Sequence, residues 1–369
     1  MKPTAFYWNE RCFWHSGGNY AFVVPAQGYV QPMAAGGLPE TPESKRRFVN
    51  LLDVTGLLAQ LDVIRGGPAS EEELRRVHPA DYLKEFKSLS DANGGELGLR
   101  TPFSKGGYEI AALSAGMAVE AVRSVAKGSH RNAYALCRPP GHHCLPTVPM
   151  GFCLMANISI AIETALVERT AARVAVLDWD VHHGNGTEHI FYDRAEVFTI
   201  SIHQEGNFQA ATGATDRRGE GAGAGYNMNV PLLPGSGHDG YCYAMERIIV
   251  PALRQYRPDI IVVACGFDAA GVDPLSRMLA TSETFRMMTQ KVQEVADEQC
   301  GGKLVLAHEG GYSEVYVPFC GHAVVQTLSR SAIDAGDPLL ERLNSKQPSR
   351  RFCEFQQTLI DEMAAYFGL

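Results

Sequence analysis

The sequence predicts a single α/β domain in which helices cover a parallel β-sheet. Short, nearly continuous apolar runs alternate along the chain with longer amphipathic runs. This alternation is typical of parallel sheets, whose strands are buried on both faces and are connected through helices. No serine- and glycine-rich linker, block of like charges or internal repeat divides the chain. We therefore expect one domain over residues 1–369.

The predicted strands are short apolar runs, and the predicted helices are longer runs with helical periodicity. The strands are expected at Asn132–Cys137, Arg173–Asp178, Val197–Ile202, Asp259–Cys265 and Lys303–Ala307. The helices are expected at Tyr108–Ala126, Asn157–Arg169, Asp239–Tyr256, Ser282–Glu298 and Arg351–Phe367.

The N-terminal stretch 15–42 has a different character. It is rich in glycine and proline and shows no clear period, yet it carries the aromatic residues Tyr20, Phe22 and Tyr29. Loops of this length are usually functional or disordered. Because aromatic residues are unusual in disordered segments, we expect a folded surface loop near the mouth of a site.

Two further segments have simpler interpretations. Gly219–Asn227 resembles a dinucleotide-binding fingerprint, but it does not lie between a strand and a helix, so a flexible loop is expected there. The basic cluster Ser44–Arg47 is expected to be a solvated helix face.

Composition excludes several classes of protein. The chain carries 33 basic and 41 acidic residues, a net charge of −8, and 45% hydrophobic residues. These values argue against a disordered chain, a membrane protein and a globally basic nucleic-acid binder. The nine cysteines are odd in number and form no C-x-x-C motif, which predicts free thiols in a reducing compartment. Since the first residues lack the features of a signal peptide, a cytoplasmic protein is expected.

Polar residues of catalytic type follow each predicted strand. They are His142 and His143; Asp178, Asp180, His182, His183 and Asn185; His203; Asp268; and His308, Glu309 and Tyr312. In open α/β sheets, ligands bind beyond the carboxyl ends of the strands. These residues therefore predict one shared site at one edge of the sheet.

Asp178, Asp180 and His182 alternate, so extended backbone directs their side chains the same way. Asp180 and His182 can bind one metal ion, with Asp178 one layer deeper and Asp268 as the third ligand. Two Asp and one His suit a catalytic zinc, although Fe²⁺ and Mn²⁺ remain alternatives. The other interpretation is that these Asp residues cap the following helix.

The segments RPPGHHC and HEGGY supply the remaining candidates. Two prolines and a glycine fix the entry to His142 and His143, which are either further metal ligands or a general acid–base pair. In HEGGY, Gly310 and Gly311 make the backbone permissive, so Tyr312 can donate its hydroxyl to a substrate oxygen. The alternatives are structural histidines and a packing tyrosine in a plain turn.

Taken in order, the motifs RPPGHHC, DWDVHHGNGT, SIHQ, GAGYNMNVPL, ACGFDA, DPL and HEGGY resemble the histone deacetylase and acetylpolyamine amidohydrolase family. RPPGHHCLPTVPMGFC looks like the class II branch, with bacterial histone deacetylase-like amidohydrolases as the best match. The resemblance implies an arginase/deacetylase-like three-layer fold around a mainly parallel eight-stranded sheet. It also implies hydrolysis of acetyl groups on a lysine-like amine.

Carried over to this chain, the resemblance assigns a role to each candidate. The zinc ligands are Asp180, His182 and Asp268. The catalytic group comprises His142, His143, Tyr312, Asp178 and Asn185. A K⁺ or Na⁺ site involves Asp178, Asp180, His182, Ser201 and Ile202. The substrate tunnel is lined by Gly151, Phe152, Phe208, Leu275, Gly310 and Gly311. Because Asp178 lies behind His142 whereas neutral Asn185 lies behind His143, the two histidines should differ in pKa.

The resemblance leaves the substrate open. An acylated lysine in a peptide or protein is expected, and a small acetylated amine such as an acetylpolyamine is the alternative. An acyl-lysine binding module without activity, or an arginase-like hydrolase, fits the residues less well. No nucleic-acid or membrane partner is expected. A homo-oligomer is compatible with the sequence, with the N-terminal loop at an interface or at the site mouth.

Overall fold

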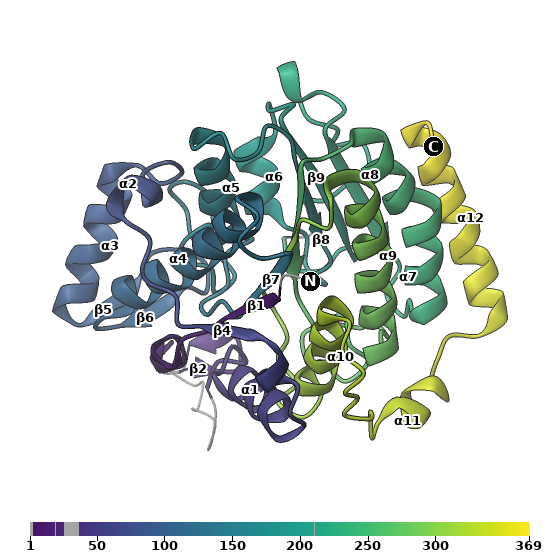
Figure 1. Ribbon diagram of the computed structural model, residues 1–369, viewed down its shortest axis with the longest axis horizontal. Coiled ribbons are helices and arrows are strands. Elements are labelled where there is room, and N and C mark those ends of the chain that lie inside the picture. Colours follow the sequence, from purple (N-terminus) through teal and green to yellow (C-terminus); the bar gives the residue numbers. More distant parts are fainter. Residues whose placement is uncertain (1–2, 19, 26–36, 210) are drawn as a thin grey trace.

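The central element is an eight-stranded sheet in which every neighbouring pair of strands is parallel (Figure 1). The computed structural model describes residues 3–18, 20–25, 37–209 and 211–369. In spatial order the strands are β10 (Asn227–Leu232), β9 (Val197–Gln204), β8 (Val174–Asp178), β11 (Ile260–Cys265), β12 (Leu304–His308), β7 (Asn132–Ala135), β1 (Thr4–Tyr7) and β4 (Asp62–Ile64). This arrangement confirms the predicted fold class.

All five predicted strands form, with ends within two residues of the predicted bounds. Strands β8, β9, β11 and β12 are buried along their whole length, which explains their continuous apolar character. Three strands of this sheet were not predicted. β1 and β4 are only 4 and 3 residues long, and β10 interrupts its apolar residues with two asparagines and Pro231. Pro231 is tolerated because β10 is an edge strand.

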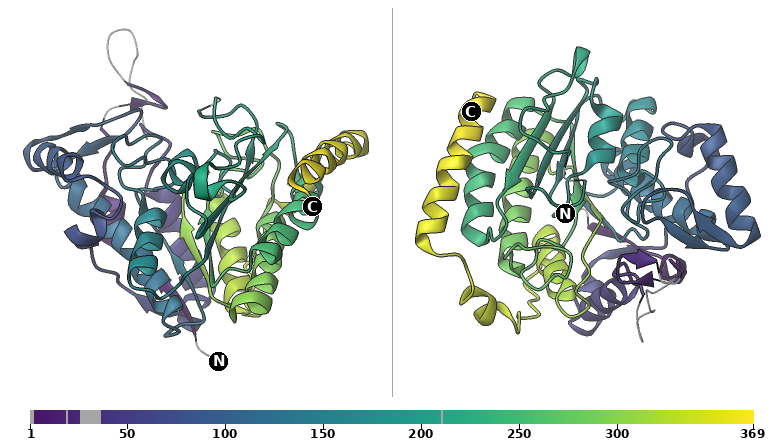
Figure 2. Two further views of the ribbon diagram at one scale, coloured as in Figure 1. Left: turned by 90° about the horizontal axis from the view of Figure 1, so that it is seen from above. Right: turned by 180° about the vertical axis from the view of Figure 1, so that it is seen from behind.

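Helices cover both faces of the sheet (Figure 1; Figure 2). One set comprises α4 (Gly107–Ala126), α5 (Asn157–Val167) and α6 (Asn185–Phe191). The opposite set comprises α7 (His238–Ala244), α8 (Val250–Tyr256), α9 (Ser282–Cys300), α10 (Val317–Ser329) and α12 (Arg350–Phe367). Helices α4 and α5 pack on each other, as do α9 and α10. The result is the three-layer arrangement that the sequence predicted.

The predicted helix Asp239–Tyr256 is continuous, but a π-helical turn, Met245–Ile249, separates α7 from α8. Pro251 lacks the N–H that an α-helix needs at this point, which explains the change of hydrogen-bonding pattern.

The other helices lie outside the predicted set. They are α1 (Glu43–Val54), α2 (Glu71–Leu74), α3 (Ala80–Ala92) and α11 (Leu340–Asn344), with 3-10 turns at Glu10–Trp14, Leu58–Gln60 and Gly221–Gly223. Two small antiparallel pairs complete the structure: β2 (Tyr20–Ala21) with β3 (Val24–Pro25), and β5 (Gly94–Glu96) with β6 (Pro102–Ser104).

One minor expectation was wrong. Lys45, in the basic cluster expected on a solvated face, is fully buried in α1 and pairs with Glu40 at 3.0 Å. The glycine-rich segment 219–227 is a loop with one 3-10 turn, as expected, and it leads directly into β10. Hydrogen bonds such as Gly225 N to Arg218 O at 2.6 Å connect it to neighbouring residues.

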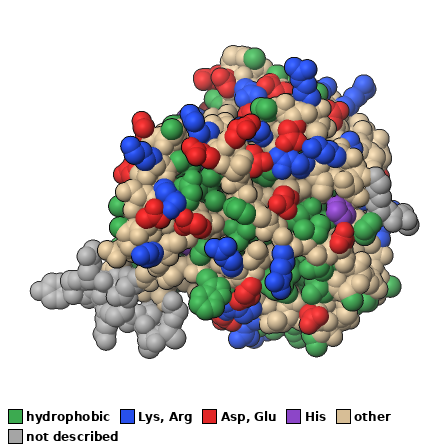
Figure 3. All heavy atoms as spheres, turned by 60° about the vertical axis from the view of Figure 1, so that its left-hand side comes forward, with side chains coloured by type: hydrophobic (Ala, Val, Ile, Leu, Met, Phe, Trp, Pro, Cys, Tyr) green, Lys and Arg blue, Asp and Glu red, His purple; other side chains and the backbone are tan. Residues whose placement is uncertain are grey.

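The surface and the cysteines agree with the composition. All nine cysteines are free thiols, as expected. On the face shown in Figure 3, acidic and basic side chains are interspersed, and neither sign gathers in a continuous patch. In the described ranges, every helix falls short of the length and apolar character needed to span a membrane.

Candidate active site

Three buried side chains converge beyond the carboxyl ends of β8 and β11, which are neighbours in the sheet. Nδ1 of His182 lies 3.0 Å from Oδ1 of Asp180 and 3.0 Å from Oδ2 of Asp268. One ligand atom from each residue lies within 4.8 Å of the other two. Asp180 and His182 follow β8, whereas Asp268 follows β11, so the sheet itself brings them together.

The backbone leaves room for this cluster only because glycine surrounds it. A Cβ atom on Gly310 would lie 2.2 Å from Oδ2 of Asp268 and 2.6 Å from Oδ2 of Asp180. A Cβ on Gly266 would lie 2.3 Å from Oδ2 of Asp180. The Gly310 N–H also donates to Oδ2 of Asp180 at 2.8 Å. These two glycines therefore let the backbone approach the carboxylates closely.

Electrostatics also suit a cation at this point. Burial and the Asp180 charge raise the pKa of Asp268 to about 6, despite hydrogen bonding from His182. Burial would lower the pKa of His182, but its hydrogen bonds with Asp180 and Asp268 raise it to about 10. Two carboxylates thus draw positive charge between them, and a divalent metal ion supplies it. The donor set of two oxygens and one imidazole nitrogen fits such an ion.

His142 and His143 lie beside this cluster, with ring centroids 3.9 Å apart. Nδ1 of His142 is 2.9 Å from Oδ2 of Asp178, and Nδ1 of His143 is 2.7 Å from Oδ1 of Asn185. The amide oxygen only accepts, so His143 carries its proton on Nδ1, which leaves Nε2 free to accept another. Asp178 and Asn185 therefore contact the same histidines to which the sequence assigned them.

The two histidines differ in pKa, as predicted. Burial would lower the pKa of His142, but the charges of Asp180 and Asp178 outweigh it and raise that pKa well above its ordinary value. For His143, burial and the positive charges of His142 and His182 lower the pKa well below it. His142 is thus suited to remain a cation and His143 to act as a neutral base.

Tyr312 faces the same cavity from the loop after β12. Its ring makes an edge contact with Phe152, with centroids 5.8 Å apart, and burial raises the pKa of its hydroxyl. The Tyr312 N–H donates to Oδ2 of Asp273 at 2.7 Å. Its hydroxyl therefore stays protonated and can serve as a hydrogen-bond donor.

A cavity of about 480 Å³ leads from solvent to these groups. Of the residues predicted to line a tunnel, Gly151, Phe152, Phe208 and Leu275 do so. The described lining does not include Gly310 or Gly311, which lie deeper, beside the carboxylates and Phe267. The lining also contains Val23, from the N-terminal stretch, and Arg100.

The described part of the N-terminal stretch packs against this cavity. Tyr20 and Leu38 form a small apolar cluster with Phe152 and Tyr312. The Tyr20 hydroxyl donates to Glu96 at 2.8 Å, which ties the stretch to β5. Residues 26–36, which complete the expected loop, lie outside the described residues.

Several residues grouped with the site in the sequence lie apart from it. His183 contacts Glu188 and Thr212, His203 contacts Ser201 and the Gly213 carbonyl, and His308 contacts the Tyr134 hydroxyl. These three histidines are buried and bind neighbours that do not belong to the cluster, and Nε2 of His308 is buried without a partner. For the expected monovalent-cation residues, Asp178 and Ser201 are register partners on β8 and β9, and Ile202 follows Ser201.

Two carboxylates near the site received no role from the sequence. Glu309 Oε2 accepts from the backbone N–H groups of Gly141 at 2.7 Å and His142 at 3.1 Å, while its Oε1 is buried without a partner. Burial raises the pKa of Glu309 to about 7. Asp273 holds Tyr312 and also accepts from the Leu275 N–H at 2.9 Å. Glu309 lies in the HEGGY motif and Asp273 in the DPL motif. Neither motif by itself indicates which backbone groups these carboxylates bind.

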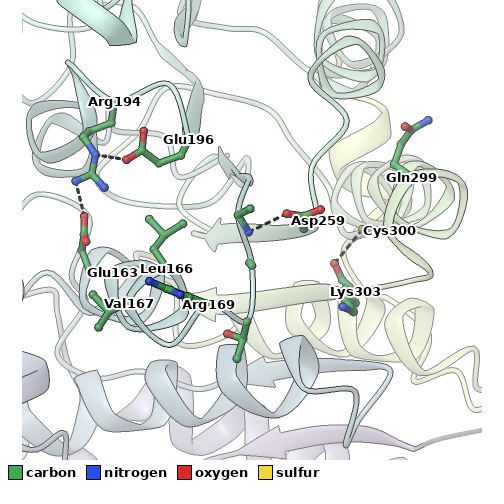
Figure 4. Close-up of a pocket in the computed structure, with 13 residues that line it drawn as sticks. Glu163, Leu166, Val167, Arg169, Arg194, Glu196, Asp259, Gln299, Cys300 and Lys303 are labelled. Carbon is green, nitrogen blue, oxygen red and sulfur yellow. Dashed lines mark hydrogen bonds and ion pairs between the residues drawn. The ribbon is translucent and has the colours of Figure 1, made fainter.

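A larger cavity of about 940 Å³ opens at the other edge of the sheet, beside the residues that precede β8, β9, β11 and β12 (Figure 4). Arg194 pairs there with Glu163 at 2.9 Å and with Glu196 at 2.6 Å. Asp259 accepts from two backbone N–H groups before β8. Arg194, Glu163 and Glu196 are thus already paired, and the convergent metal-ligand and acid–base groups lie at the smaller cavity.

Comparison with known proteins gives a consistent result. The histone deacetylase domain model matches residues 38–328. A histone deacetylase-like amidohydrolase of Pseudomonas aeruginosa is 54% identical over 368 residues, which cover 100% of this chain and 97% of that protein. Histone deacetylase 8 of Arabidopsis thaliana is 36% identical, with 85% and 86% coverage. The crystal structure of the HDA15 HD domain matches with a TM-score of 0.81 and 30% identity, covering 99% of this chain and 98% of that one.

Proposed function

Because the chain belongs to the histone deacetylase family, we propose that it is a zinc-dependent amidohydrolase acting on acylated lysine. Its reaction is hydrolysis of the amide between an acetyl group and the ε-amine of lysine in a peptide or protein. One observation carries this proposal: a metal-ligand cluster, a low-pKa histidine and a tyrosine meet at one cavity, which His182, His143 and Tyr312 line.

The proposed zinc ligands are Asp180, His182 and Asp268. A bound zinc ion polarises the acyl carbonyl and acidifies the attacking water. The protein supplies the remaining chemistry. His143 is the proposed general base, because its Nδ1 is held by Asn185 and its low pKa leaves Nε2 unprotonated.

The other proposed roles follow from charge and position. The Tyr312 hydroxyl donates a hydrogen bond to the oxyanion of the tetrahedral intermediate. His143 then returns its proton to the leaving amine. His142 remains a cation because Asp178 contacts it, and it stabilises the negative charge that develops beside it. The phenyl rings of Phe152 and Phe208 flank the alkyl chain of the lysine.

Further parts of the proposal concern the whole chain. A K⁺ or Na⁺ ion is proposed beneath the zinc site, held by Asp178 and Ser201 with the carbonyls of Asp180, His182 and Ile202. Residues 1–369 form a single deacetylase domain, with the stretch 15–42 near the site mouth. The free thiols support a cytoplasmic location.

An acyl-substrate panel with metal-analysed protein tests this function. Wild-type protein with one zinc per chain is expected to release acetate from acetyl-lysine peptides, and a chelator is expected to abolish that release. Faster hydrolysis of acetylputrescine than of any peptide would make the protein an acetylpolyamine deacetylase instead. Stoichiometric peptide binding without acetate release would identify an acyl-lysine binding module.

A further inference from the structure

The mouth of the cavity carries an unusual charge distribution. Among its described lining residues, Arg100 is the one with a permanently charged side chain, and none is Asp or Glu. The residues outside the described ranges cannot supply a carboxylate either, since 1–2, 19, 26–36 and 210 contain no Asp or Glu. The permanent charge among the described lining residues is therefore positive.

Arg100 lies at the solvent end of the cavity and is held in place there. It is partly exposed, and the preceding Leu99 is 50% exposed. The carbonyls of Leu99 and Arg100 accept from the N–H groups of Gly151 at 2.9 Å and Phe152 at 3.0 Å. These bonds fix the backbone of Arg100 against the cavity wall.

The backbone of Arg100 is strained, with a φ of 59° in the left-handed region that non-glycine residues rarely adopt. This conformation places the guanidinium over the Phe208 ring, 5.8 Å from its centroid. Strain of this kind persists where the surroundings hold it, and it clusters at ligand sites.

In the described part of the chain, the Arg100 guanidinium forms no ion pair with a carboxylate, and it lies over the Phe208 ring. Glu96, on the nearby β5, is engaged elsewhere: it accepts from the Tyr20 hydroxyl at 2.8 Å and the Thr101 N–H at 3.1 Å. Arg100 therefore presents a fixed guanidinium that is free to bind an incoming anion.

We propose that Arg100 forms a carboxylate subsite at the mouth, which selects acyl-lysine substrates carrying an acidic group next to the acyl-lysine and disfavours acylated polyamines. This inference rests on the proposed function and names its substrate class. The carboxylate can come from a flanking acidic side chain or from the free α-carboxylate of acetyl-lysine. A polyamine instead brings a second cation towards Arg100, and no Asp or Glu among the described lining residues compensates for it.

Matched substrates test the subsite. They are acetyl-lysine peptides with Asp or Asn beside the acetyl-lysine, free acetyl-lysine and its carboxamide, and acetylputrescine. We expect kcat/KM of wild type to favour each carboxylate member about 5-fold at low salt, mainly through KM. The peptide pair reports a side-chain carboxylate, and the amino-acid pair reports the α-carboxylate. Rising salt should weaken both preferences.

Variants then assign the preference to this residue. Arg100→Gln should bring both ratios close to 1, and Arg100→Glu should raise the kcat/KM for acetylputrescine relative to the Asn peptide. The control Arg350→Gln removes the same charge from the exposed end of α12 and should keep the wild-type ratios.

Equal kcat/KM for both members of each pair in wild type, or an unchanged ratio in Arg100→Gln, would overturn the subsite while leaving the deacetylase function intact. Absence of turnover on every substrate by zinc-loaded wild type would overturn the proposed function, and the subsite with it. If Arg100→Glu does not fold, the paired ratios of wild type and the milder Arg100→Gln still decide between these outcomes.

Discussion

His142 and His143 are adjacent and identical in side chain, yet their surroundings give them opposite tendencies to hold a proton. His142 contacts Asp178, whereas His143 contacts the neutral Asn185 and lies beside two imidazoles. The division of labour between cation and base is thus set by single contacts. The same holds for Tyr312, whose backbone depends on one carboxylate, Asp273.

Replacing Tyr312 by Phe removes one hydroxyl and little else. We expect kcat for an acetyl-lysine peptide to fall by about 10²–10³, because the oxyanion loses a hydrogen-bond donor. Zinc content should stay near that of wild type, because Tyr312 is not a ligand. Steady-state kinetics with elemental analysis measure both. The exposed Tyr366→Phe on α12 is the control, and full activity of Tyr312→Phe would remove the oxyanion role.

Asp273→Asn should lower kcat with zinc content preserved, because the amide holds the Tyr312 and Leu275 N–H groups less strongly than the carboxylate does. We expect a loss of about 10-fold. A double-mutant cycle with Tyr312→Phe checks the cause. If Asp273 acts by positioning Tyr312, the substitution has little further effect when the hydroxyl is already missing. Fully additive losses would show that Asp273 acts independently.

Strand ends organise the chemistry at the scale of elements. β8, β11 and β12 lie side by side, and the loops that follow them contribute the metal ligands and Tyr312. Glu309 links the β12 end to the histidine loop through two backbone N–H groups. The site is therefore a set of loops held in register by a rigid sheet.

Gly310→Ala tests how tightly the β12 loop packs on the metal site. The added methyl group would lie within 2.6 Å of a carboxylate oxygen from both Asp180 and Asp268. We expect zinc affinity to fall by about 10–100-fold, measured by competition with a chromophoric chelator. Gly95→Ala on β5, where a Cβ meets only ordinary contacts, is the matched control. Wild-type zinc affinity in Gly310→Ala would contradict the close approach seen here.

On the scale of the whole molecule, buried polar links join distant segments. His78 accepts the Ala156 N–H on Nε2 at 3.0 Å and donates from Nδ1 to the Pro146 carbonyl at 2.9 Å. It thereby fixes the segment before α3 to the segments on either side of the tunnel wall. Burial lowers the pKa of His78 to about 4.

This link should make stability depend on pH. His78 titrates near 6.5 when unfolded and near 4 when folded, so the unfolded state binds more protons in that window and stability falls as pH falls. We expect His78 to account for about 2 kcal/mol of lost unfolding free energy between pH 7 and pH 5. Denaturant unfolding of wild type and His78→Gln at both values tests this. Their difference should shrink at pH 5, whereas exposed His189→Gln should follow wild type.

The sequence by itself determined the fold class, five central strands and the main group of His, Asp and Tyr residues that meet at the site. These properties are local, since a strand buried on both faces is continuously apolar and its carboxyl end must carry the polar residues. The tertiary structure decided the rest. Glu40 beside Lys45 also pairs with Arg138, 98 residues away, and Asp273 meets Tyr312 from 39 residues away. Arg100 at the cavity mouth forms no ion pair among the described residues. Such contacts join segments whose local sequence patterns carry no information about one another, so only the packing of the whole chain can reveal them.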